Sequence, residues 1–185
     1  AANAGSDQNL CLNSSTTLAA NTPAIGTGMW SQVSGAAATI ADATNPATTV
    51  TGLTPGNYVF RWTISFSNCT ANTDDVQVII YDNPSPADAG TDQTICSAST
   101  TLTGNTPVVG NGTWTQIGST PAAATITTAS SASTTVTGLN NPGTYQFKWT
   151  ISNGPCVPRQ DTVAITVTEV GTTAAAGNDI DACIG

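Results

Sequence analysis

The chain has 185 residues, and its eleven acidic and three basic side chains give it a net charge of −8, with no histidine. Nucleic acids and anionic membrane surfaces bind clustered lysine and arginine, so neither is an expected partner. Hydrophobic residues make up 39% of the chain and form no long apolar run. No membrane insertion is therefore expected, and the length suits one large or two small domains.

Short threonine-rich and valine-rich segments, separated by turn residues, follow one another along the chain. Such segments favour strands, and none combines helix caps with an apolar stripe of period 3.6, so we expect almost no helix. The predicted strands are residues 16–20, 29–33, 38–40, 48–53, 58–65 and 76–80, and then 100–103, 112–117, 134–139, 145–152 and 163–167.

The strongest strand signal occurs twice. Residues 58–65 read Tyr-Val-Phe-Arg-Trp-Thr-Ile-Ser, and residues 145–152 read Tyr-Gln-Phe-Lys-Trp-Thr-Ile-Ser. Large apolar residues occupy alternate positions in both, which is the period of a strand with one buried face. Other landmarks also recur after roughly 85 residues, which indicates a tandem repeat. We predict two units, residues 1–84 and 85–171, and the start of a third at residues 172–185.

Each unit has the strand count of a small antiparallel sandwich with immunoglobulin-like topology. In that topology Leu18 would face Phe60 across the core, and Leu102 would face Phe147. Tyr58 follows a Pro-Gly bend, in the place of a tyrosine corner, as does its counterpart in the second unit. The predicted fold class is all-β, a tandem array of immunoglobulin-like sandwiches.

One further set of motifs is shared by both units. It comprises Ala-Gly-x-Asp-Gln or a close variant, a cysteine, Gly-x-Trp, Thr-Val-Thr-Gly-Leu, and Tyr-x-Phe-x-Trp-Thr-Ile-Ser followed by a second cysteine. This set resembles the polycystic-kidney-disease-like (PKD-like) and immunoglobulin-like repeats of very large Bacteroidetes cell-surface adhesins of the gliding-motility kind. The resemblance implies export through the type IX route and a place in a long surface fibre.

The cysteines are Cys11, Cys69, Cys96, Cys156 and Cys183, and the absence of histidine and of a CxxC motif favours disulfides over a zinc or redox site. Disulfides imply an oxidising, extracytoplasmic setting. Three pairings stay open: Cys11–Cys69 and Cys96–Cys156 within units, Cys69–Cys96 between neighbours, or Cys11–Cys156 across the junction. Cys11 and Cys69 belong to opposite ends of one sandwich, whereas stacking two units end to end brings Cys11 near Cys156. The junction pairing would leave Cys96 for a following unit and Cys69 for a preceding one.

Aspartates gather near the predicted unit boundaries, where carboxylates can bind calcium and stiffen an array. They are Asp82, Asp88, Asp92, Asp179 and Asp181. Their spacing matches no calcium loop, and each is equally suited to a turn. We therefore expect neither a metal site nor any cofactor.

No catalytic residues are expected, because without histidine the usual activated nucleophile is missing. The pair Asp74–Asp75 has the residue types of a glycosidase, but its expected role is to keep a loop soluble. Asp161-Thr162-Val163 resembles the O-glycosylation site of Bacteroidetes, with Thr162 as the acceptor. The first residues lack the pattern of a signal peptide, as expected if it has been removed or if this is a window of a longer chain.

The predicted function is structural: an extracellular, cell-surface segment of a long adhesin or filament that spaces its ends and transmits load during attachment or gliding. Its expected partners are neighbouring repeats and other copies in a fibre, with a surface polysaccharide or protein bound at a tip outside this window. The alternatives are a carbohydrate- or protein-binding module, which needs an exposed aromatic cluster such as one around Tyr81, and an accessory stalk of a secreted enzyme.

Overall fold

The computed structural model describes residues 1–118 and 121–169, and every regular element in that part of the chain is a strand. The first unit contains β1 (Gln8–Cys11), β2 (Ser15–Thr17), β3 (Thr27–Ser34), β4 (Thr39–Ile40), β5 (Thr49–Thr51), β6 (Gly56–Ser65) and β7 (Asn72–Tyr81). The second contains β8 (Gln93–Ile95), β9 (Ser99–Thr103), β10 (Asn111–Ile117), β11 (Thr125–Ile126), β12 (Ser133–Thr137), β13 (Gly143–Ser152) and β14 (Arg159–Val167).

Each unit is a sandwich of two sheets. In the first, the sheet β1-β7-β6-β3 packs on β2-β5-β4, and in the second, β8-β14-β13-β10 packs on β9-β12-β11. Pairing is antiparallel except that β1 runs parallel to β7 and β8 runs parallel to β14. The predicted all-β fold of tandem immunoglobulin-like sandwiches is confirmed. The prediction lacked β1, β8 and β11, which are all short.

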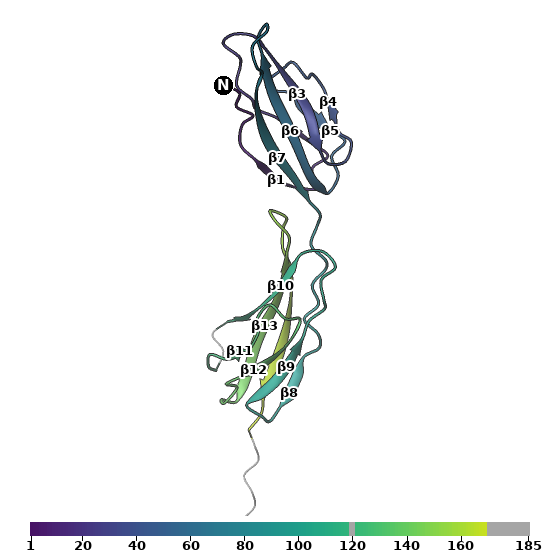
Figure 1. Ribbon diagram of the computed structural model, residues 1–185. Coiled ribbons are helices and arrows are strands. Elements are labelled where there is room, and N and C mark those ends of the chain that lie inside the picture. The colour runs from purple at the N-terminus through teal and green to yellow at the C-terminus, as the bar shows by residue number, and fades with distance from the viewer. Residues whose placement is uncertain (119–120, 170–185) are drawn as a thin grey trace, which may run out of the picture.

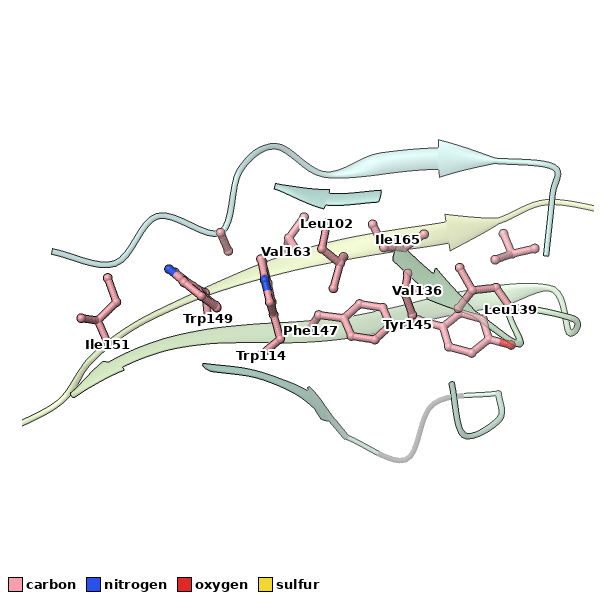
Figure 2. Packing of buried hydrophobic residues seen from close by; sticks show 12 residues of the cluster. Leu102, Trp114, Val136, Leu139, Tyr145, Phe147, Trp149, Ile151, Val163 and Ile165 are labelled. Carbon is pink, nitrogen blue, oxygen red and sulfur yellow. The ribbon is translucent and has the colours of Figure 1, made fainter. Parts of the chain in front are cut away.

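The repeated strand forms the centre of each core. On β6, Tyr58, Phe60 and Trp62 are fully buried, and the indole of Trp62 lies 5.1 Å from that of Trp30 on β3. Figure 2 shows the same arrangement in the second sandwich, where the alternating side chains of β13 point between the two sheets toward Leu102 and Val136. Burial of this aromatic ladder stabilises each sandwich by the hydrophobic effect and by tilted ring contacts.

A tyrosine corner lies near the start of β6 and near the start of β13, as predicted. The hydroxyl of Tyr58 donates to the carbonyl oxygen of Thr54 at 3.0 Å and accepts from the N–H of Thr54 at 2.8 Å. Tyr145 makes the same two bonds to Asn141, at 3.2 and 3.3 Å. Both phenol rings are buried, so these bonds satisfy polar groups that water does not reach.

The pair Asp74–Asp75 lies in strand β7, and the expectation of a soluble loop is wrong. A carboxylate oxygen of Asp74 accepts the N–H of Ala4 at 2.7 Å. Asp75 makes two bonds with the guanidinium of Arg61 on the neighbouring strand, at 2.7 and 2.8 Å. Cross-strand register, which brings Arg61 opposite Asp75, overrides the turn preference of aspartate.

Acidification is expected to weaken the first sandwich slightly through Asp75. Its hydrogen bonds from Arg61, aided by the charge of that guanidinium, hold the pKa of Asp75 below its ordinary value. A depressed folded pKa contributes stability above the unfolded pKa of about 4, and this is lost as pH falls through the folded value. The effect is small because the two side chains are 42% and 40% exposed.

The measurement is urea unfolding of the native chain and of Asp75→Asn at about pH 6 and about pH 3. The variant should lose part of the pH dependence. The second sandwich provides the internal control, because Lys148 there pairs in register with the uncharged Thr162. An unchanged pH dependence in Asp75→Asn would show that the ion pair contributes nothing.

Candidate functional site

The junction between the two sandwiches is the candidate functional site. Figure 1 shows the sandwiches stacked end to end, with the turn between β13 and β14 reaching toward the lower end of the first sandwich. At that end Cys11 is the last residue of β1 and pairs in register with Tyr81, the last residue of β7. The turn itself, residues 153–156, carries Cys156.

A disulfide joins Cys11 to Cys156 across the junction, with the Cα atoms 5.0 Å apart and a sequence separation of 145. This is the pairing expected from stacking the units end to end. The two pairings within units are absent, because each would need one of these same cysteines. Cys156 is only 3% exposed, whereas Cys11 is half-buried, so the bond is covered mainly on the Cys156 side.

Direct packing supports the disulfide. The ring of Tyr81 lies against Gly154, where an added Cβ would stand 2.5 Å from ring carbon Cδ1. Gly154 has φ of +53°, a conformation that favours glycine. The side-chain amide of Asn153 donates to the carbonyl oxygen of Asp82 at 2.8 Å. The turn of residues 153–156 is therefore held against the end of the first sandwich by close packing and a hydrogen bond as well as by the disulfide.

The connecting segment is also fixed to the second sandwich. Pro84 is buried. The hydroxyl oxygen of Ser85 accepts the N–H groups of Val108 and Val109 at 3.0 and 2.9 Å, and the N–H of Ser85 donates to the carbonyl oxygen of Val109 at 3.0 Å. Two proline residues further restrict the backbone of residues 82–88. The junction thus has two connections, a docked linker and a disulfide, which together oppose bending and twisting.

The two other cysteines in the described part of the chain lie at the ends of the sandwiches that face away from the junction. Cys69 lies on the turn after β6, and Cys96 directly follows β8; both are exposed and unbonded. Cys183 lies outside the described residues. Thr162 is exposed on β14, and its role as a glycan acceptor stays a prediction.

The aspartates near the boundary do not gather into one site. Asp88 accepts the N–H of Gly90 at 2.8 Å, and Asp92 accepts that of Ala164 at 2.8 Å. Asp82 accepts the N–H of Asn83 at 2.7 Å. Within residues 1–118 and 121–169 no three acidic, cysteine or histidine side chains form a group suited to a metal ion. Asp179 and Asp181 lie outside this part of the chain.

Tyr81 packs against Gly154 at the junction and is not an isolated exposed platform. Sequence reasoning gave the Cys11–Cys156 junction pairing as one of three open alternatives, and it missed the Tyr81–Gly154 contact. The sequence did carry a signal for this contact. Glycine occurs in the bonded turn, Asn153-Gly154-Pro155-Cys156, but not in the matching turn, Phe66-Ser67-Asn68-Cys69.

No described segment is a helix able to cross a membrane.

Comparison with known proteins places this geometry in context. The model of the K319L-like PKD domain family matches residues 4–80 and again residues 89–167. The solution structure of the PKD domain from the KIAA 1837 protein is 31% identical, covering 44% of this chain and 85% of that one, with a TM-score of 0.40. No curated protein matches the sequence.

Two other solved structures match most of the chain, and so both of its sandwiches. Immunoglobulin domains 1–5 of Sidekick-1 give a TM-score of 0.59 at 14% identity, covering 89% of this chain and 38% of that one. Murine CEACAM1b gives 0.53 at 14% identity, covering 88% and 96% of the two chains. At these identities the likeness shows the fold alone. The chain spans little more than a third of the Sidekick-1 fragment.

Proposed function

Because the chain belongs to the K319L-like PKD domain family, whose model matches both of its units, we propose that it is a load-bearing segment of an extracellular fibre. PKD and immunoglobulin-like domains are typically non-catalytic structural or adhesion modules, and we assign this segment no catalytic step. A single observation carries the proposal: the disulfide that joins one unit to the next. A disulfide within each sandwich would stabilise that sandwich, whereas a disulfide between the two sandwiches fixes their spacing and orientation.

The bond also changes the path of a pulling force. Tension applied at the two chain ends passes from β1 through Cys11 and Cys156 into β14. Residues 12–155 form a covalent loop beside that path, and strands β2 to β13 lie within it. Most of both sandwiches is thereby shielded from extension. A segment built in this way holds its length under load, as a tether or spacer requires.

Single-molecule pulling tests the proposal. The full chain is held by its ends and stretched with and without reductant. The reduced chain should release up to about 500 Å more contour length than the oxidised chain, since the 145-residue separation is extended at about 3.5 Å per residue. The matched control is Cys69→Ser/Cys96→Ser, which keeps the junction bond and should behave as the native chain. Equal extension in the oxidised and reduced chains would contradict the shielding.

We also propose a cellular setting for this fibre, supported by the resemblance of its motifs to the repeats of gliding-motility adhesins of Bacteroidetes. The chain would be exported through the type IX route and displayed at the cell surface, with a third repeat beginning at residue 172. A surface polysaccharide or protein would be bound at a tip beyond this window. Thr162 is the proposed glycan acceptor, supported by its exposure on β14. Mass spectrometry of the secreted native chain and of Thr162→Ala checks the modification, which the variant should lack.

A further inference from the structure

The two sulfur atoms of the junction disulfide lie in different surroundings. Cys156 is 3% exposed, and its Sγ atom lies 3.3 Å from the carbonyl oxygen of Asp82 and 3.8 Å from that of Tyr81. Cys11 is half-buried, and its Sγ atom lies 3.9 Å from the side-chain oxygen of Asn83, which is exposed. A reagent in solvent therefore reaches the bond from the Cys11 side.

The end of the first sandwich is what covers Cys156. The N–H of Cys156 donates to the carbonyl oxygen of Asn153 at 3.1 Å. The N–H of Cys69 makes the equivalent bond to Phe66 at 3.0 Å, yet Cys69 is exposed. The local conformation of the turn therefore does not bury its cysteine. The cover of Cys156 comes from docking, with the ring of Tyr81 lying against the same turn.

This asymmetry decides how the bond can be exchanged. A thiolate that attacks one sulfur of a disulfide forms a mixed disulfide with it and expels the other sulfur. Attack at the accessible Cys11 makes Cys156 the leaving group. A thiolate at Cys156 would face the carbonyl oxygen of Asp82, whereas the neutral thiol can donate its S–H to that oxygen, 3.3 Å away. Uptake of a proton from solvent therefore completes the exchange.

We propose that Cys11 is the attachment site for a small thiol such as glutathione, which opens the junction by one-sided exchange. The glutathione sulfur bonds to Sγ of Cys11, the Cys11–Cys156 bond breaks, and its electron pair leaves on Cys156, which takes up a proton. Glutathione is the only co-reactant. In the reverse exchange Cys156 attacks the mixed disulfide, expels glutathione and closes the junction.

The consequence for the fibre is reversible extensibility. A junction opened in this way no longer holds residues 12–155 in a covalent loop, so tension can extend them. This consequence rests on the proposed function, whereas the exchange itself is a property of the folded chain and is tested without any load.

The test uses the full-length chain with Cys69→Ser/Cys96→Ser/Cys183→Ser, in which Cys11 and Cys156 are the remaining cysteines. Reduced glutathione is added, early samples are quenched with acid, and free thiols are capped with N-ethylmaleimide. Trypsin then separates Cys11, in residues 1–61, from Cys156, in residues 149–159. Mass spectrometry should find about tenfold more glutathione on Cys11 than on Cys156, because access and leaving group both favour it. Equal amounts on the two cysteines would overturn the proposal.

A second variant tests the cause of the selectivity. Tyr81→Ala, made in the same protein, should uncover Cys156 and bring the ratio of the two adducts toward one. Val157→Ala is the matched control, because Val157 adjoins Cys156 in sequence but is 79% exposed, and it should keep the native ratio. An unchanged ratio in Tyr81→Ala would contradict the assigned role of docking. Either failure leaves the proposed function intact, since the pulling measurement depends on the presence of the bond and not on which sulfur is attacked.

Discussion

Replacing both Cys11 and Cys156 with serine is expected to let the two sandwiches reorient while each remains folded. Without the bond, the direct contacts between the sandwiches include the Tyr81–Gly154 packing and one hydrogen bond from Asn153 to Asp82. Such a small interface does not hold two domains in one orientation, so relative motion becomes the default. The cores stay intact because neither cysteine belongs to the hydrophobic clusters of the two sandwiches.

Residual dipolar couplings measured by NMR provide the readout. In the native chain one alignment tensor should fit both sandwiches. In Cys11→Ser/Cys156→Ser the two sandwiches should need separate tensors of different magnitude, as expected for domains that move independently. Cys69→Ser/Cys96→Ser is the matched control and should keep the single tensor. A single tensor in the junction variant would show that the linker alone sets the orientation.

The bond also limits the disorder of the unfolded chain. Closing a loop of this size lowers the entropy of the unfolded ensemble by an amount worth about 5 kcal/mol in the chain-entropy model. This stabilisation belongs to the whole two-sandwich segment, since the loop includes strands of both. The disulfide therefore fixes the junction and stabilises its neighbours with one covalent link.

Gly112→Ala is expected to destabilise the second sandwich by about 3 kcal/mol or more, a large part of the stability of a small domain. A Cβ at Gly112 would lie 2.0 Å from carbon Cζ2 of Trp149, which is fully buried. The indole has nowhere to move, because it packs 5.0 Å from the ring of Trp114. The glycine of the Gly-x-Trp motif is therefore needed because Trp149, from the neighbouring strand β13, packs directly over it.

Urea unfolding followed by tryptophan fluorescence measures this effect. Gly28→Ala should produce the same loss in the first sandwich, where the added Cβ would lie 2.0 Å from Trp62. Thr113→Ala is the control, because its side chain is exposed on the same strand. A loss in Gly112→Ala no larger than in Thr113→Ala would mean that the core repacks around the new methyl group.

The sequence allowed prediction of those parts of the fold that local pattern and internal repetition encode. Alternation in residues 58–65 predicted most of β6, and the Pro-Gly bend before it predicted the tyrosine corner. Strands β1 and β8 were missed because they are short and pair in parallel with the distant ends of β7 and β14. That pairing depends on tertiary contact and leaves little local signal.

The junction was only partly predictable for a similar reason. Counting strand lengths placed Cys11 and Cys156 at adjoining ends, which rests on topology alone. The fit of Gly154 against Tyr81 depends on how two separate loops meet. Asp75 is a smaller example, since its partner Arg61 lies 14 residues away and is brought close only by cross-strand register. Side-chain complementarity between elements requires the assembled structure.

Non-reducing tryptic mapping of the full chain tests the central claim, a covalent junction between units, most directly. Cleavage after Arg61, Lys148 and Arg159 gives residues 1–61, 62–148, 149–159 and 160–185. Cys11 and Cys156 then lie on the first and third fragments, whereas Cys69 and Cys96 share the second. A disulfide linking residues 1–61 to residues 149–159 is the predicted result. Links from residues 62–148 to both of those fragments would indicate bonds within units and contradict the account.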